Sequence, residues 1–254
     1  MTRSVVSVDK DERLEHVLDL MRKHRVTKIP VLEHGRLVGV ATDGLIADEL
    51  GGLRTVGKPA SSLHASTVTF RDVKTISPEA DWEDALDLLR GNSVGLVPVT
   101  HDGTLLGVVT KSDFLAFVES GRPLSDVMKR DLHAVSPTDR VIHARRVMID
   151  EKVERLPVLL SGQLVGIVTE TDIAFGLARF KAEFPPNHQK HQLKEFLVED
   201  IMVRSVVTAT PDTPVRHAAR RMREQDIGAL PLTNGAGRIA GMVTRSDLLA
   251  TIEG

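Results

Sequence analysis

The sequence predicts an α/β protein built from four tandem copies of one small unit. Three observations carry this prediction. An amphipathic helical stripe recurs four times, a short strand with a proline follows each stripe at a fixed distance, and a glycine turn with a second strand follows each proline. The chain has 254 residues, of which 41% are hydrophobic, so four such units can bury substantial cores. We place the units at residues 1–60, 61–121, 122–185 and 186–254.

Each unit contains an apolar stripe that starts 16 residues before a proline. Apolar residues near i, i+3, i+4 and i+7 lie on one face of an α-helix, so each stripe predicts a helix packed on a core. The stripes and their prolines are Leu14, Val17, Leu18 and Met21 with Pro30; Trp82, Ala85, Leu86 and Leu89 with Pro98; Val141, Ala144 and Met148 with Pro157; and Val215, Ala218, Ala219 and Met222 with Pro231. One residue departs from the pattern, because Arg145 occupies the i+4 slot of the third stripe.

A hairpin of two short strands follows each helix. The first strands cover residues 26–31, 94–99, 153–158 and 227–232. Each leads into a tight turn, where glycine accepts the positive φ that a hairpin requires. The turns are His34-Gly35, Asp102-Gly103, Ser161-Gly162 and Asn234-Gly235, and the second strands contain Gly39, Gly107, Gly166 and Gly241. With a leading strand, best seen at 73–78, 134–137 and 206–211, and an apolar second helix, each unit has the order β-α-β-β-α.

A unit of about 60 residues can cover one face of its sheet with two helices but leaves the other face apolar. This predicts that adjacent units pack face to face. We therefore expect two pseudo-twofold pairs of units, each pair sharing a core formed by its sheets.

Composition excludes several function classes. The formal charge is -2 with 33 Lys and Arg against 35 Asp and Glu, so nucleic-acid binding is not expected. Aromatic residues make up 3% of the chain, which leaves few platforms for stacking bases. The absence of cysteine removes thiolate catalysis, and no apolar run is long enough for a membrane span. We expect a cytoplasmic protein.

The corner between the second strand and the second helix repeats a short motif in three units. It reads Gly107-Val108-Val109-Thr110-Lys111-Ser112-Asp113, Gly166-Ile167-Val168-Thr169-Glu170-Thr171-Asp172 and Gly241-Met242-Val243-Thr244-Arg245-Ser246-Asp247. Together with the Pro-Val strand before it, this motif resembles the cystathionine-β-synthase (CBS) domain family. The resemblance covers nearly the whole chain as four tandem copies, which would form two Bateman modules.

The resemblance implies a site for adenosine-containing ligands in clefts between paired units. The aspartates of the three motifs resemble the residues that accept the ribose hydroxyls, the Thr and Ser residues lie near the phosphates, and strand backbone contacts the adenine edge. The residues so implied are Asp113, Asp172 and Asp247; Thr110, Ser112, Thr169, Thr171, Thr244 and Ser246; and Gly95, Leu96, Arg155, Leu156, Ala229 and Leu230. A helix N-terminus also offers free amides and a positive dipole end to phosphate. The first unit has Gly44 and Leu45 in place of Ser and Asp, so we expect its ribose contact to be lost.

The same motif has a purely structural explanation. Thr-x-x-Asp before an apolar run is a capping box, in which both side chains satisfy free amides of the first helical turn. That alternative requires no ligand and stays open at the sequence level.

A basic residue two positions before the strand proline would face the phosphates in nucleotide-binding members of the family. The four positions hold Lys28, Leu96, Arg155 and Ala229. Two cations in a partly desolvated cleft would favour AMP, ADP or ATP over uncharged adenosyl ligands. Alternatively, Lys28 and Arg155 simply face solvent on a strand edge.

We expect a regulatory sensor, since no set of residues supports catalysis or a resident metal. Its ligand would be AMP, ADP or ATP, and its output would pass to a separate, unidentified protein. His188 and His191 share the spacing of some metal ligands, but a solvated linker explains them better. Remaining apolar faces suggest a homodimer. The alternatives are a structural or protein-interaction module without nucleotide binding, and a binder of S-adenosylmethionine-type ligands.

Overall fold

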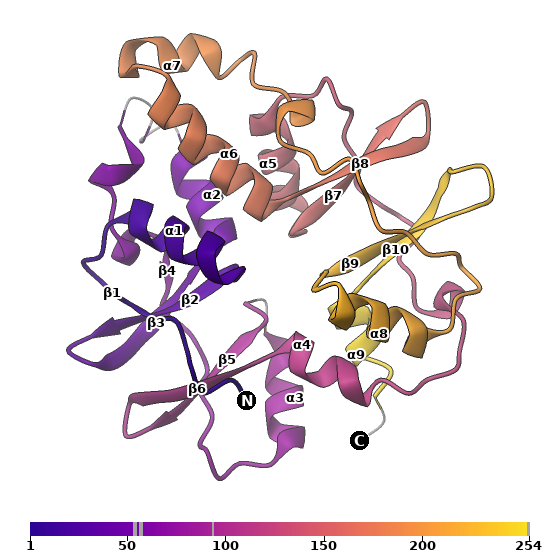
Figure 1. Ribbon diagram of the computed structural model, residues 1–254, viewed down its shortest axis with the longest axis horizontal. Helices are drawn as coiled ribbons and strands as arrows, with labels where there is room; N and C mark the ends of the chain where they lie inside the picture. Colours follow the sequence, from indigo (N-terminus) through magenta and orange to yellow (C-terminus); the bar gives the residue numbers. More distant parts are fainter. Residues whose placement is uncertain (53–54, 56–57, 93, 253–254) are drawn as a thin grey trace.

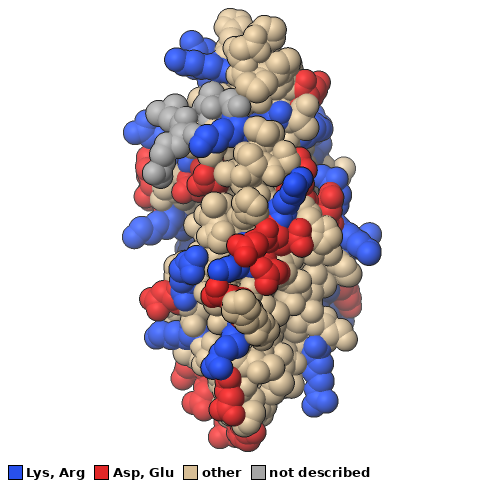
Figure 2. Space-filling view, turned by 90° about the vertical axis from the view of Figure 1, so that its left-hand side faces the viewer, with Lys and Arg blue, Asp and Glu red and all other residues tan. Residues whose placement is uncertain are grey.

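The four units form a flat ring. The computed structural model describes residues 1–52, 55, 58–92 and 94–252. Seen down the shortest axis, unit 1 is followed around the ring by unit 2, unit 4 and unit 3, and their closing helices begin near the centre (Figure 1). The view onto the left-hand rim shows Lys and Arg interspersed with Asp and Glu, so this rim carries no patch of a single sign (Figure 2). The α/β class with four such units is confirmed.

Each unit has a first helix, a hairpin and a closing helix. Unit 1 comprises β1 (Val8–Asp9), α1 (Leu14–His24), β2 (Lys28–Glu33), β3 (Arg36–Thr42) and α2 (Asp43–Gly51). Unit 2 comprises α3 (Trp82–Gly91), β5 (Leu96–His101), β6 (Thr104–Thr110), α4 (Lys111–Phe114) and the 3-10 turn η4 (Leu115–Phe117). Unit 3 comprises α5 (Val141–Glu151), β7 (Arg155–Leu160), β8 (Gln163–Thr169) and α6 (Glu170–Glu183). Unit 4 comprises α8 (Val215–Glu224), β9 (Ala229–Thr233), β10 (Ile239–Thr244) and α9 (Arg245–Leu249).

Connectors between the units hold short elements. They are η2 (Ala60–Ser62), η3 (Ala65–Val68) and β4 (Thr69–Phe70) before unit 2, η5 (Leu124–Asp126) before unit 3, and α7 (Pro186–Gln192) and η6 (Val198–Asp200) before unit 4. The leading strands of units 2, 3 and 4 are shorter than expected. Each is reduced to a single parallel bridge, Ile76 with Val99, Val135 with Val158 and Ala209 with Leu232.

The four helical stripes are buried as predicted, with one exception. Residues of all four stripes lie in the cores, but Trp82, the first residue of the second stripe, is 44% exposed. Three of the hairpin turns have the expected positive φ at both residues. The fourth differs from the prediction: the positive φ falls on Gly237 and not on Gly235, because this hairpin is longer and its turn lies further along the chain.

The glycine in each second strand lies under the leading segment of the adjacent unit. Thr2 bridges Val108, Phe70 pairs with Val40, Val203 bridges Ile167 and Lys129 bridges Met242. A Cβ at Gly107 would lie 2.9 Å from the carbonyl oxygen of Thr2, and a Cβ at Gly241 would lie 2.8 Å from that of Lys129. Glycine therefore leaves room for the crossing chain. Units 1 and 2 exchange leading segments in this way, and so do units 3 and 4.

The main cores do not follow these sequential pairs. One large cluster joins units 1 and 3, with Ile46 and Leu156 among its fully buried residues. A second cluster joins units 2 and 4, with Leu86 and Met222 among its buried residues. Units 1 and 2 share a sheet through β3 and β6, and only a small cluster that includes Val40 lies between them. Adjacent units are paired as expected, through the exchanged leading segments, but the largest clusters join units across the ring, where α2 contacts α6 and α4 contacts α9. No helix within the described residues has the length and apolar character needed to cross a membrane.

Candidate functional site

Each aspartate of the repeated motif caps its own helix. One carboxylate oxygen, Oδ2, accepts the backbone N–H of the preceding Thr at 2.7 Å for Asp113, 2.8 Å for Asp172 and 2.7 Å for Asp247. The same oxygen accepts the hydroxyl of that Thr at 2.9, 2.7 and 2.7 Å. The structural part of the sequence analysis is thus confirmed: Thr110, Thr169 and Thr244 form capping boxes with these acids.

The second carboxylate oxygen is not used in this way. Within the described residues, Oδ1 of Asp113 and Oδ1 of Asp172 have no hydrogen-bond partner, and Oδ1 of Asp247 lies 3.7 Å from Nζ of Lys129. The cap fixes the carboxylate in place and leaves one strong acceptor for another molecule. Burial raises the pKa of Asp172, and the hydrogen bonds from Thr169 oppose this rise.

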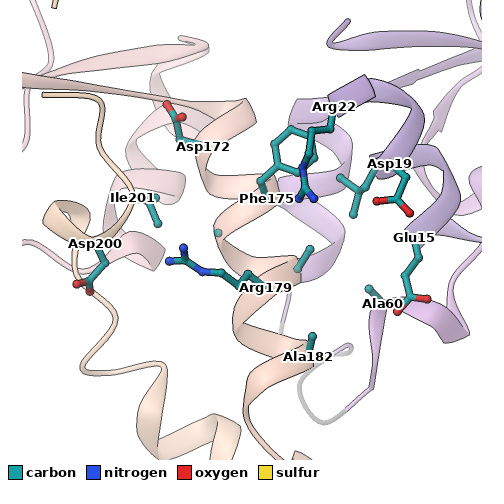
Figure 3. A pocket seen from close by; sticks show the side chains of 13 residues that line it. Glu15, Asp19, Arg22, Ala60, Asp172, Phe175, Arg179, Ala182, Asp200 and Ile201 are labelled. Carbon is teal, nitrogen blue, oxygen red and sulfur yellow. The ribbon is translucent and has the colours of Figure 1, made fainter. Parts of the chain in front are cut away.

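Asp172 borders a cavity of about 610 Å³ between α1 of unit 1 and α6 of unit 3. Figure 3 shows Phe175 of α6 beside Arg22 of α1, whereas the side chains of Asp172 and Arg179 point away from α1, that of Arg179 toward Asp200. The guanidinium of Arg22 lies 5.0 Å from the centre of the Phe175 ring. Four carboxylates (Glu15, Asp19, Asp172 and Asp200) and two guanidinium groups (Arg22 and Arg179) line this cavity, so its formal charge is negative. It therefore offers an acidic environment beside the free oxygen of Asp172.

The closing helices meet their partners across the ring through the first residues of each helix. In the half made by units 1 and 3, the Thr171 hydroxyl donates to Asp43, and a Cβ at Gly44 would collide with the Glu170 carboxylate. In the half made by units 2 and 4, Nζ of Lys111 donates to the Ser246 hydroxyl at 2.7 Å. The helix starts thus carry acids in one half and a cation in the other.

Burial and neighbouring charges change the ionisation of this centre. Burial and the nearby carboxylates of Asp43 and Glu154 raise the pKa of Glu170 to about 7. Burial opposes the ionisation of Glu154, but the cations of Lys28 and Arg155 outweigh it and lower its pKa. Burial lowers the pKa of Lys111. The centre is therefore a mixed cluster in which protonation responds to added charge.

The two basic residues predicted from the strand pattern reach this cluster. Arg155 donates to Glu154 at 2.7 Å, and its guanidinium also covers Gly228 of unit 4. Lys28 lies near Glu154 and contributes to its lowered pKa. Arg155 therefore does not simply face solvent: it spans the two units of a sequential pair.

The predicted strand residues do not expose their side chains. The side chains of Leu96, Ala229, Leu156 and Leu230 are buried. Gly95 has φ +70°, and the Lys111 side chain passes 3.6 Å from where its Cβ would be. Ser112 makes no side-chain hydrogen bond within the described residues.

Sequence reasoning missed the first residue of each closing helix. Asp43, Lys111, Glu170 and Arg245 occupy the variable position after the Thr of the motif. Their shared position was visible in the sequence, but only the pairing of units across the ring shows which of them face one another. No group of acidic, histidine or cysteine residues suited to a metal ion occurs in the part of the chain that the structure describes.

Comparison with known proteins identifies the family. The model of the CBS domain matches residues 1–52, 65–120, 124–179 and 198–254, so the chain belongs to the CBS domain family. Protein MJ1225 of Methanocaldococcus jannaschii is 26% identical over 97% of this chain and 95% of its own length. Its crystal structure covers 100% of this chain and 98% of that chain with a TM-score of 0.88, and it has been proposed as an archaeal homolog of g-AMPK. A 33.4 kDa protein of Thermofilum pendens, encoded in a ribosomal RNA operon, is 27% identical over 96% of this chain and 87% of its own length.

Proposed function

We propose that this CBS-domain protein is a regulatory sensor that binds adenosine-containing ligands, with AMP, ADP or ATP preferred, and passes their occupancy to a separate partner. One observation carries the proposal: three aspartates at equivalent helix starts are held by one oxygen and present the other. A vicinal diol of ribose requires such a fixed acceptor.

The sites would be built around Asp113, Asp172 and Asp247. Thr and Ser hydroxyls of the same corners and the helix N-termini would lie near the phosphates, and Lys28, Lys111 and Arg155 would supply positive charge. Unit 1 would lack a ribose contact because Leu45 stands where the other three units have the aspartate.

Transmission would depend on the contacts between units. Sequential units exchange leading segments, whereas the main cores join units across the ring. A ligand between two units would favour the relative orientation that it binds more tightly, and only that difference in affinity can shift the equilibrium. The partner and a homodimeric state remain part of this proposal.

A second candidate ligand is an S-adenosylmethionine-type molecule. The cavity beside Asp172 favours it, because four carboxylates and two guanidinium groups surround the space and would attract a cationic group and repel a phosphate. The two candidates predict opposite preferences at this one site.

Titration calorimetry with adenosine, AMP, ATP and S-adenosylmethionine tests the function. The wild type should bind at least one of them, and Asp113→Ala, Asp172→Ala and Asp247→Ala should each lower the number of occupied sites or weaken one site by about tenfold, as expected when a hydrogen bond to a charged acceptor is lost.

Each of these substitutions also removes a cap, so a matched control is needed. Asp139 accepts the backbone N–H of Ser136 at 2.8 Å in the same manner. Asp139→Ala should cost about 1 kcal/mol of stability but leave ligand affinity unchanged. If no ligand binds the wild type, or if Asp139→Ala and the three motif variants behave alike, the sensor proposal fails and the corners serve as caps alone.

A further inference from the structure

The first helix of three units begins beneath a connector of the chain. Leu14 donates its backbone N–H to the carbonyl of Leu63, Val141 to that of Phe196 and Val215 to that of Arg122, each at 2.9 Å. All three helix-starting side chains are fully buried. The connector before unit 2 docks on unit 1, the connector before unit 4 docks on unit 3, and the connector before unit 3 docks on unit 4. Each connector therefore docks on the other unit of the pair that exchanges leading segments.

Each connector also donates two hydrogen bonds back and buries one aliphatic side chain. Its donors are Ala65 and Ser66 on unit 1, Val198 and Glu199 on unit 3, and Leu124 and Ser125 on unit 4. Their acceptors are the carbonyls of Glu12 and Lys10, of Asp139 and Pro137, and of Thr213 and Pro211, at 2.8 to 3.0 Å. Ala65, Val198 and Leu124 are fully buried. The chain thus uses the same docking arrangement three times.

Unit 2 has the receiving half of this arrangement, but no described residue occupies it. The equivalent groups are the N–H of Trp82 and the carbonyls of Ala80 and Pro78. Within the described residues, none of these three groups has a backbone hydrogen-bond partner. Trp82 itself is 44% exposed, whereas its three counterparts are fully buried.

The open place is apolar at its centre and acidic around it. The Trp82 ring stacks on Phe117 with centroids 5.8 Å apart and an interplanar angle of 10°, and Phe117 is 55% exposed. Four exposed carboxylates lie on the same short stretch of chain, at Glu79, Asp81, Glu83 and Asp84. None of the four forms an ion pair with a described residue.

We propose that this place on unit 2 binds an extended segment of a partner protein, in which an aliphatic residue packs on Trp82 and Phe117 and flanking Lys or Arg residues face the four carboxylates. The segment would accept a hydrogen bond from Trp82 and donate two to Ala80 and Pro78, as the three connectors do elsewhere. Backbone pairing of this kind supplies affinity, and the side chains supply specificity. The charge of the rim favours a basic segment.

The three connectors of this chain cannot supply the segment, since they are already docked on units 1, 3 and 4. The proposal is independent of nucleotide binding, because the open place lies on the first helix of unit 2 and not at the aspartate corners. It would give the sensor a defined contact for its output.

Trp82 is the only tryptophan in the chain, so its fluorescence reports on this place directly. The probe is the peptide Lys-Arg-Pro-Leu-Ser-Lys, whose central residues copy the connector over unit 4. We expect a saturable shift of the emission to shorter wavelength as the indole leaves water. Replacing Leu by Asp in the peptide should weaken binding at least about tenfold, the equivalent of a lost aliphatic side chain.

A second peptide and a second variant sharpen the test. Glu-Glu-Pro-Leu-Ser-Glu should bind more weakly than the basic peptide, and the difference should shrink at high salt. Met1 covers Gly107 as Met128 covers Gly241. Placing a copy of residues 122–127 directly before Met1 should therefore fill the place from within, shift the Trp82 emission without peptide and abolish peptide binding.

Three results would overturn the proposal. The first is equal affinity of the Leu and Asp peptides, the second is the absence of a saturable emission shift with any peptide, and the third is an emission shift that depends on protein concentration alone. The last result would assign the place to a second copy of this chain.

Discussion

The two halves of the ring have the same fold but opposite charge where their closing helices meet. Units 1 and 3 join through α2 and α6, of 9 and 14 residues, whose first residues are Asp43 and Glu170. Units 2 and 4 join through α4 and α9, of 4 and 5 residues, whose first residues are Lys111 and Arg245. A helix N-terminus stabilises negative charge. At the first position of the closing helices, units 1 and 3 thus carry carboxylates, whereas units 2 and 4 carry cations that can pair with an anion.

This difference shows that a repeated motif fixes geometry without fixing charge. The Thr and Asp of the corner recur because the cap needs them, but the residue between them is free to vary. Its charge acquires meaning only when two units face each other across the ring.

The largest expected difference between the halves is in stability. It concerns the arginines that donate to carbonyl groups at the end of the closing helix of the unit across the ring. Arg145 of unit 3 donates to Asp48 and to the carbonyl of Gly51 at the end of α2 and is largely buried. Arg145→Ala should lower the free energy of unfolding by about 3 kcal/mol, since it leaves these acceptors without a partner. Denaturant titration measures this loss.

Arg90 is the matched control in the other half. It donates to the carbonyls of Leu249 and Ile252 at 3.1 and 2.6 Å and is more exposed. Arg90→Ala should cost about 1 kcal/mol. Equal losses for the two variants would mean that the halves are held together in the same way.

The second prediction concerns pH. The pKa of Glu170 is raised to about 7 from 4.5, so its contribution to stability is present below 4.5 and is lost as pH rises through about 7. Glu170→Gln should have the stability of the wild type near pH 4.5 and be more stable than the wild type by about 3 kcal/mol above pH 7. Unfolding measured across this pH range tests the sign.

Ser246→Ala in the basic half removes a side chain at the corresponding interface without removing a titratable group. It should leave the pH dependence of the wild type unchanged. If Glu170→Gln does not change that dependence, the acidic half is not the source of it.

The smallest expected effect is on the preference for a charged ligand over an uncharged one. Lys111→Ala and Arg155→Ala should each weaken ATP by about fivefold, or about 1 kcal/mol, and leave adenosine unchanged, because the cations face phosphate and not the nucleoside. Calorimetry with both ligands measures the ratio. Equal losses of ATP and adenosine would contradict a phosphate role for these residues.

Much of the fold was predictable because it depends on local patterns. The stripe of Leu14 and Met21, the turns at Gly35 and Gly103, and the cap of Thr169 by Asp172 all follow from spacing and backbone preference. Arg145 looked like a defect in its stripe. Its role as a cap was hidden because its acceptors lie 94 and 97 residues away in the chain.

The candidate site was predictable in part. Sequence placed the three aspartates and Arg155 at the corners and strands, and the structure brings Arg155 against Gly228 of the next unit. It did not reveal Glu170 opposite Gly44, because that contact depends on which units pair across the ring. The ligand roles of the aspartates and the boundaries at 60, 121 and 185 stay predictions.

The sequence by itself determined the four units, their internal order and the capped corners, since neighbours along the chain settle helix stripes, hairpins and caps. Only the tertiary structure decided that the cores join units 1 with 3 and 2 with 4, that one half is acidic and the other basic, and that Trp82 stays uncovered. Those features arise from contacts between segments far apart in the chain, where shape and burial, not local pattern, select the partner.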